Sequence, residues 1–222
     1  MSAFIIAVDG PAASGKGTIA LRLGEQYGLP VLDTGLLYRA VGVTLLRQGG
    51  DLGDEAAAAA VASRIDVRRL DDPGFRALNS GEAASRVAAH QAVRDALYTL
   101  QRAFATRLGG AVIDGRDIGT VICPEAPAKL YITATPKERA RRRWLQLTAA
   151  GGVISYEDVL DDIVRRDDRD ARRPNAPMRQ ADDAVLIDTT ELTISAAADA
   201  ARRIVETARA KWSKAPQGTT SG

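Results

Sequence analysis

The sequence predicts an α/β fold, in which a doubly wound sheet of five parallel strands is covered by helices on both faces to give three layers. Short apolar runs rich in β-branched residues alternate along the chain with segments of helical periodicity, and the runs end near polar residues. The 222 residues include 45% hydrophobic and 26% charged side chains. That length and composition are ordinary for one globular domain with a sizeable core.

The predicted strands are the apolar runs, each of which suits a strand buried in a parallel sheet. The first, Phe4–Val8, ends at the turn signal Asp9-Gly10, and the others are residues 29–32, 111–113, 129–133 and 184–187. Helical periodicity predicts helices between and after them. These helices cover residues 16–27, 36–48, 54–64, 82–108, 137–148, 155–168 and 194–212.

Glycines and turn residues mark the ends of the predicted helices. Gly28 stands where a helix C′ glycine belongs, and Gly49-Gly50 end the second helix. Residues 65–81 are the least regular, with a clear turn at 71–74. The longest predicted helix, 82–108, ends at Gly109-Gly110. Its apolar residues recur every three or four positions, at Val93, Leu97, Leu100, Phe104 and Leu108.

Composition excludes several classes of protein. A single cysteine, Cys123, and a single histidine, His90, exclude an intrachain disulfide, a multi-cysteine zinc site and a multi-histidine metal site. Lys and Arg number 30 against 28 Asp and Glu, so neither nucleic acid nor a membrane surface is expected as a partner. The first residues read as a strand and not as a signal peptide, so we expect a cytoplasmic protein.

A glycine-rich loop between the first strand and the first helix predicts a phosphate-binding site. Its residues fit the P-loop pattern G-x-x-x-x-G-K in the strand–loop–helix context that the motif requires. Backbone amides and the positive end of the helix point at the phosphates, and the lysine adds a mobile charge. The residues of this loop are Gly10, Pro11, Ala12, Ala13, Ser14, Gly15, Lys16, Gly17 and Thr18.

One position departs from the usual P-loop. The Ser or Thr that normally follows the lysine is Gly17, and Thr18 comes one residue later. A direct protein ligand to Mg²⁺ is therefore not predicted. We expect the ion to be held by phosphates and waters, which suits its reluctance to dehydrate.

Two loops after later strands carry candidate ligands for an acceptor anion. Thr34 and Arg39 follow the second strand and can converge on one anion, because ligands bind at the carboxyl edge of such sheets. Arg116 and Asp117 follow the third core strand. Arg116 can bind a phosphate in bidentate fashion, and Asp117 can accept a hydrogen bond from an amino group such as that of a base.

Arginines are also dense at residues 139–143 and 165–173. Such charge runs are commonly solvated helix faces. Phosphoryl transfer, however, needs cations on the transferring group and exclusion of water. Gly151-Gly152 and Pro174 bracket the second run, which predicts a mobile lobe that closes over the site.

Six motifs together resemble bacterial cytidylate kinases, in the P-loop nucleoside monophosphate kinase superfamily. The motifs are GPAASGKGT, LDTGLLYR, AASRVAA, VRDAL, IDGRDIGT and RRDDRDARR, and the similarity extends from about residue 5 to about 208. The resemblance implies an adenylate-kinase-like core, an NMP-binding insert, a small lid, and transfer of the γ-phosphoryl of Mg-ATP to CMP or dCMP. It also implies that residues 10–18 bind ATP.

The resemblance assigns roles to nine further residues. Positions that hold the acceptor phosphate in the family are Thr34, Arg39, Arg116 and Arg173; those that read cytosine are Ser85, Arg94 and Asp117; those near the sugar are Arg166 and Asp170. Charge stabilisation during transfer is expected from Lys16, Arg116, Arg166 and Arg173. No protein metal ligand is implied.

The resemblance also implies a division of the chain. The core would comprise about 1–35, 109–149 and 176–212, the insert about 36–108 and the lid about 150–175, with 213–222 a frayed tail. The insert is shorter than in other members between residues 67 and 85, so its small sheet is not assured. We expect a monomer.

Two other functions stay open on the residues alone. The first is a P-loop kinase of UMP or another small anionic acceptor. The second is a nucleotide-binding switch, which the absence of an Asn-Lys-x-Asp sequence disfavours.

Overall fold

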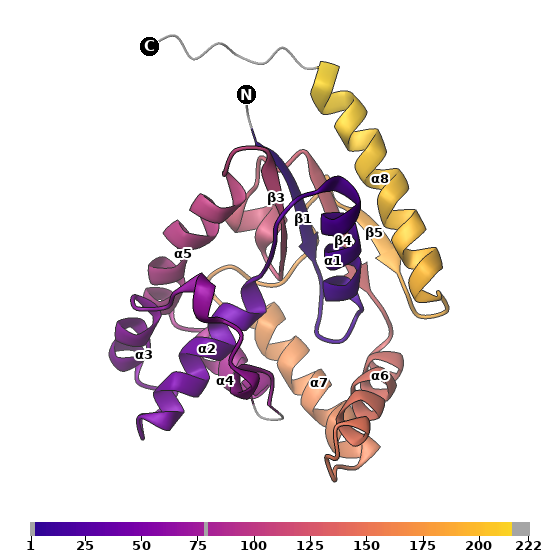
Figure 1. Cartoon of the computed structure of the whole chain (residues 1–222). Helices are drawn as coiled ribbons and strands as arrows, with labels where there is room; N and C mark the ends of the chain where they lie inside the picture. Colours follow the sequence, from indigo (N-terminus) through magenta and orange to yellow (C-terminus); the bar gives the residue numbers. More distant parts are fainter. Residues whose placement is uncertain (1–2, 78–79, 215–222) are drawn as a thin grey trace, which may run out of the picture.

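The computed structural model describes residues 3–77 and 80–214 and shows five parallel strands with helices on both faces (Figure 1). The predicted fold class is therefore confirmed. The strand order in the sheet is β2-β3-β1-β4-β5. The strands are β1 (Phe4–Asp9), β2 (Val31–Asp33), β3 (Gly110–Gly115), β4 (Ala128–Thr133) and β5 (Val185–Asp188).

Eight α-helices and three short helical turns are present within the described ranges. The α-helices are α1 (Lys16–Tyr27), α2 (Thr34–Arg47), α3 (Glu55–Ala62), α4 (Ser80–Val87), α5 (Gln91–Ala105), α6 (Pro136–Ala149), α7 (Tyr156–Arg172) and α8 (Ile194–Lys214). The turns are η1 (Val67–Arg69), η2 (Pro73–Arg76) and η3 (Ile118–Ile122). Of the tail expected at 213–222, residues 213–214 belong to α8 and the rest lie outside the described residues.

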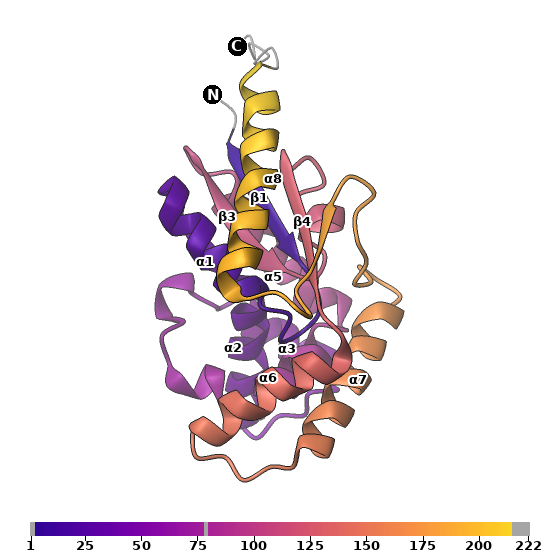
Figure 2. The same ribbon diagram turned by 90° about the vertical axis from the view of Figure 1, so that its right-hand side faces the viewer.

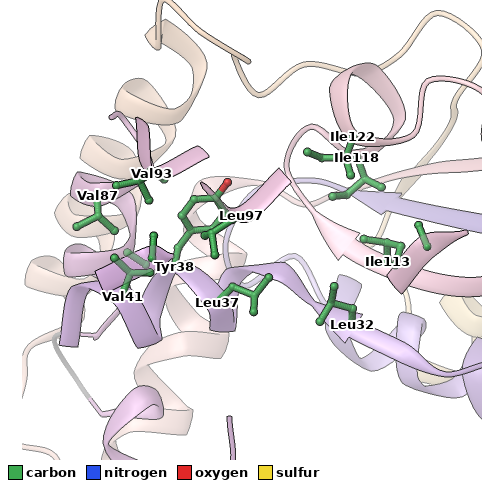
Figure 3. Packing of buried hydrophobic residues seen from close by; sticks show 14 of the residues in the cluster. Leu32, Leu37, Tyr38, Val41, Val87, Val93, Leu97, Ile113, Ile118 and Ile122 are labelled. Carbon is green, nitrogen blue, oxygen red and sulfur yellow. The ribbon is translucent and has the colours of Figure 1, made fainter. Parts of the chain in front are cut away.

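Alternation along β1 explains the two cores. Ile5 and Ala7 point to the face that carries α2 and α5, whereas Phe4, Ile6 and Val8 point to the face that carries α1 and α8. Figure 3 shows the first core, in which the helices of the region after β2 pack toward the sheet and η3. Both faces of the central strand are therefore buried, as a parallel sheet requires.

The prediction of a single helix over residues 82–108 is wrong. The chain forms α4 and α5 with a break at residues 88–90, and His90 adopts an extended backbone as the N-cap of α5. Contacts from elsewhere in the fold stabilise the break: His90 Nε2 lies 2.8 Å from the Leu52 carbonyl oxygen, and Glu55 accepts from the Ala92 amide at 2.9 Å. Tertiary contacts thus override the high helix propensity of Ala88 and Ala89, which lie in the break.

The same helix also ends earlier than predicted. α5 stops at Ala105, and Gly110 already belongs to β3 instead of ending the helix. Leu108, the last residue of the predicted apolar stripe, is 93% exposed. Between residues 36 and 108 the described residues form helices and turns without a strand, in keeping with the shortened insert.

The helices that follow β2 and the helices that follow β4 gather at the carboxyl edge of the sheet. In Figures 1 and 2 the strands β1, β3 and β4 point toward the part of the molecule that holds α2, α4, α6 and α7. The chain leaves β1 for β2 on one side and leaves β3 for β4 on the other, so the strand order reverses between β1 and β3. Ligand sites of doubly wound sheets lie at such a reversal.

Candidate active site at the carboxyl edge of the sheet

The loop from Gly10 to Gly15 has the backbone of an anion cradle. Gly10 has φ of +146°, and a Cβ there would lie 1.9 Å from the carbonyl oxygen of Ile132, so only glycine fits. Gly15 is the N-cap of α1 and supplies no side-chain cap. The amides of the first turn therefore point into the loop, where an anion can accept from them. The Ser14 hydroxyl is buried with no hydrogen-bond partner among the described residues.

Lys16 extends from the first turn of α1 toward β3. Its Nζ lies 3.8 Å from Oδ1 of Asp114 and 3.4 Å from the carbonyl oxygen of Pro11. Burial, together with the positive charge of Arg116, lowers the pKa of Lys16 to about 8. Burial likewise raises the pKa of Asp114 to about 6. The lysine is thus held in a partly desolvated place, where additional negative charge would stabilise its ammonium form.

The ends of β2 and β3 are tied together beside this lysine. The Thr34 hydroxyl donates to the carbonyl oxygen of Asp114 at 2.8 Å, and both residues are buried. Asp33 caps α2 by accepting from the amide of Leu36 at 3.1 Å. The start of α2, which carries Arg39 one turn further on, is therefore fixed against β3, the strand that Arg116 directly follows.

A buried polar cluster joins α2, α5 and the loop after β3. Arg94 donates to the Asp117 carboxylate and, at 3.4 Å, to the hydroxyl of Tyr38. All three residues are at most 8% exposed. A buried arginine needs such partners, because an unpaired charge is costly away from water. The pair leaves the Asp117 carboxylate further lone pairs for a ligand donor.

Helix α7 reaches across to the same place from the other side. Asp170 accepts from the Ser85 hydroxyl at 3.0 Å and from Arg116 Nε at 3.3 Å. Arg173 donates to the Asp170 and Ala88 carbonyl oxygens, each at 3.4 Å. Arg173 Nη2 and Arg166 Nε are buried without a partner in the described part of the chain. These two donors are available to a ligand.

The acceptor-side residues singled out in the sequence line one cavity of about 50 Å³. The structure brings all nine together: Thr34, Arg39, Ser85, Arg94, Arg116, Asp117, Arg166, Asp170 and Arg173. The link to the P-loop is Asp114: its Oδ1 lies 3.8 Å from Lys16 Nζ, and its carbonyl oxygen accepts from Thr34, which lines the cavity. A larger hollow of about 1200 Å³ lies between β5 and α8, but it lacks such a convergence of arginines, so size alone does not identify the site.

Four site residues were not among the sequence predictions. Asp9 and Asp33 end β1 and β2, and Asp114 is the penultimate residue of β3. A carboxylate near the end of each strand was a signal available in the sequence. Arg143 on α6 belongs to the basic run noted at 139–143. Burial lowers the pKa of Arg39, and the charges of Arg166 and Arg143 lower it further. These arginines therefore form a cluster of like charges, and a bound anion would reduce the repulsion between them.

The described residues do not form a ready-made cluster of metal ligands. Among residues 3–77 and 80–214 there is no group of three or more His, Cys, Asp or Glu side chains placed to hold an ion. Within the same ranges, no helix has the length and apolarity needed to cross a membrane.

Comparison with known proteins gives matches over nearly the whole chain. A sequence model of the family described as "Cytidylate kinase" matches residues 6–208. The chain is 62% identical over 216 residues to the cytidylate kinase of Caulobacter sp. (strain K31), covering 97% of this chain and 100% of that protein. It is 58% identical over 206 residues to the cytidylate kinase of Xanthobacter autotrophicus, covering 93% and 99%.

Among solved structures, an uncharacterized protein from Eubacterium ventriosum resembles this chain with a TM-score of 0.53. The alignment covers 92% of this chain and 98% of that one at 16% identity. A likeness at that identity supports the shared fold alone.

Proposed function

The chain belongs to the cytidylate kinase family, and from this premise we propose how its residues divide the reaction. The enzyme transfers the γ-phosphoryl group of ATP to the phosphate of CMP or dCMP, giving ADP and CDP or dCDP, a step of pyrimidine nucleotide metabolism. Residues 10–18 hold the phosphates of ATP. The cavity lined by Arg39, Arg116 and Asp117 holds the acceptor.

The observation that carries this division is the pair of buried, unpartnered guanidinium nitrogens beside a P-loop. Arg166 Nε and Arg173 Nη2 find no acceptor among the residues that the structure describes, and both side chains line the same cavity as Arg39 and Arg116. Buried donors of this kind require an acceptor. We assign that acceptor to phosphate oxygens of the bound nucleotides.

In the proposed complex, each part of the acceptor nucleotide contacts its own group of cavity residues. Its phosphate contacts Thr34, Arg39, Arg116 and Arg173. Its cytosine contacts Ser85, Arg94 and Asp117, whose carboxylate accepts from the exocyclic amino group. Its sugar lies by Arg166 and Asp170, and the Asp170 carboxylate accepts from a ribose hydroxyl. Uracil has a carbonyl in place of the amino group, so it would leave Asp117 without its donor.

Transfer needs no strong base, since the acceptor oxygen is already anionic. Catalysis therefore rests on positioning and on charge neutralisation. Lys16, with Arg116, Arg166 and Arg173, surrounds the phosphoryl group as its charge spreads over the equatorial oxygens. Arg143 adds positive charge from α6, where the charge of Arg166 lowers its pKa in addition to burial.

The residues present fit a hydrated Mg²⁺ ion better than a directly ligated one. Asp114 Oδ1 is buried and has no hydrogen-bond partner among the described residues, so it can accept from a metal-bound water. Gly17 provides no hydroxyl. We propose that phosphate oxygens and waters hold the ion, where it would neutralise negative charge on the phosphates.

The division into core, insert and lid is part of the same proposal. Residues about 36–108 would form the acceptor-binding insert and about 150–175 the lid, with the remaining residues to 212 as core. All residues of both substrate sites come from one chain, which supports a monomer. Small diffusible substrates and a net charge of +2 fit a cytoplasmic enzyme with no nucleic-acid partner.

An acceptor panel tests the proposal. Purified protein is mixed with Mg-ATP and separately with CMP, dCMP, UMP and AMP, and ADP formation is measured. CMP and dCMP should support the fastest turnover. Faster turnover with UMP would indicate a UMP-type kinase, and ADP formation that is equal with and without acceptor would indicate a slow hydrolytic switch.

A further inference from the structure

The helical turn η3 directly follows Asp117, and its first backbone amides need acceptors. An aspartate that precedes a helical turn ordinarily caps it with its own carboxylate, which accepts from the amides two or three residues on. Asp117 is the N-cap residue of η3 but makes no such side-chain bond. Its carboxylate accepts from Arg94. Another group must therefore cap η3.

Asp9, on the neighbouring strand, supplies the missing cap. Its Oδ1 accepts from the amide of Ile118 at 2.8 Å, and its Oδ2 accepts from the amide of Gly119 at 2.7 Å. Asp9 is 5% exposed and ends β1, where it pairs in register with Gly115. A Cβ at position 119 would lie 3.3 Å from Oδ2, so glycine gives the carboxylate room to reach both amides.

We propose that Asp9 is a positioning residue for base recognition: it caps η3 in place of Asp117 and so leaves the Asp117 carboxylate turned to Arg94 and the acceptor cavity. The inference rests on the proposed role of Asp117 in reading cytosine. It gives β1 two tasks, because the residue after Asp9 opens the ATP loop while Asp9 itself fixes the loop that reads the acceptor.

Competition between two acceptors explains why removing Asp9 should affect Asp117. Without the Asp9 oxygens, the amides of Ile118 and Gly119 would be buried donors lacking acceptors, which is costly. Asp117 is the N-cap residue of η3, and an N-cap carboxylate can accept from the amide two residues on, which here is that of Gly119. Asp117 would then turn away from Arg94 and from the base.

The first test replaces Asp9 with asparagine, which has the same shape. Asp9→Asn keeps one acceptor oxygen but places an amino group against a backbone amide. We expect kcat/KM for CMP to fall about tenfold to a hundredfold, on the scale of one charge-assisted hydrogen bond. The value for UMP should fall less, so the ratio of kcat/KM for CMP to that for UMP decreases. KM for ATP should change by less than about twofold, which is a smaller effect than the loss of one hydrogen bond would cause.

A matched control makes the same substitution at a helix cap elsewhere in the chain. Asp54 caps α3 by accepting from the amide of Ala57 at 2.9 Å, and it does not line the acceptor cavity. Asp54→Asn should leave the CMP/UMP ratio unchanged. Thermal unfolding of both variants separates loss of stability from loss of selectivity. If Asp9→Asn is unfolded at the assay temperature, Asp9→Ser, whose hydroxyl can still accept one amide, takes its place.

A double-mutant cycle tests whether Asp9 acts through Asp117. In an Asp117→Ala background, Asp9→Asn should cause no further fall in the CMP/UMP ratio. An additional independent fall in that background would overturn the proposal. An unchanged ratio in the Asp9→Asn single variant, with a raised KM for ATP, would overturn it too and assign Asp9 to the P-loop. If the unmodified enzyme itself fails to prefer CMP over UMP, the proposed reading of cytosine fails instead.

Discussion

Lys16 is the residue whose positive charge we most directly expect to affect the rate of phosphoryl transfer. Its ammonium group lies between the ATP loop and Asp114 in a place that burial makes unfavourable for a cation. Lys16→Ala should lower kcat by about 10²–10³, the scale of losing one preorganised charge-stabilising donor. Steady-state kinetics with CMP measures this. Lys137→Ala, on the exposed start of α6, serves as the control, and near-normal turnover by Lys16→Ala would contradict the role.

The lowered pKa of Lys16 predicts a pH dependence for ATP binding. In the free enzyme the ammonium form is lost as pH rises through about 8, so affinity for ATP should fall above that pH. Bound phosphates favour the charged form, so binding near pH 8 should take up protons. Calorimetry in two buffers of different ionisation enthalpy measures the uptake. Lys16→Arg, which stays charged, should remove it, and buffer-independent heats for the unmodified enzyme would refute the prediction.

At the scale of elements, one buried ion pair holds α6, α7 and the P-loop together. Arg139, 3% exposed, donates to the carbonyl oxygens of Ala134 and Ala12 at 2.9 and 3.2 Å and to both carboxylate oxygens of Asp167. Removing one partner of such a pair leaves a buried charge uncompensated. The position of α7 relative to the ATP loop therefore depends on Asp167.

We expect Asp167→Ala to lower the free energy of unfolding by about 3 kcal/mol, the lower end for a broken buried pair because Asp167 is partly exposed. The neighbouring Asp168→Ala breaks an exposed pair with Arg172 and should cost less than about 0.5 kcal/mol. Denaturant unfolding of the two variants gives the comparison. Equal losses would show that Arg139 finds other partners.

The elements also show what a sequence can and cannot predict. The P-loop was predictable because its strand, glycines and lysine are contiguous in the sequence. The placement of Thr34 and Asp117 at the edge of the sheet was predictable because both follow predicted strands. The break at His90 was not, because it depends on Leu52 and Glu55. The cap on η3 was hidden for the same reason, since its donors and Asp9 are 109 and 110 residues apart.

At the scale of the whole molecule, the acceptor cavity is closed too tightly for a nucleotide. Its volume is about 50 Å³, whereas ligand pockets hold about 300 Å³ or more. Helices α4 and α7 both contribute residues to the cavity, and an ion pair joins them: both carboxylate oxygens of Glu82 accept from Arg169, at 2.9 and 3.0 Å. Admission of CMP should therefore require α4 and α7 to separate.

Cross-linking these two helices tests that requirement. Glu82→Cys with Arg169→Cys provides two thiols for a short cleavable linker, while buried Cys123, whose pKa burial raises to about 11, should stay unmodified. The linked enzyme should lose CMP binding, and cleavage of the linker should restore it. Each single cysteine variant treated in the same way is the control. Undiminished CMP affinity in the linked enzyme would show that the nucleotide enters by another route.

The adjacency of β1 and β3 has a consequence for how far apart the reactants can be. In the proposed division of the site, the loop for ATP follows β1 and the loop for the acceptor follows β3. Neighbouring strands of a sheet are spaced by about 4.8 Å. The strand spacing therefore sets how far apart the two loops begin. One intervening strand would double the separation of the loop starts to about 10 Å, and closure of the site would have to bridge that larger gap to reach the ~3.5 Å of a near-attack geometry.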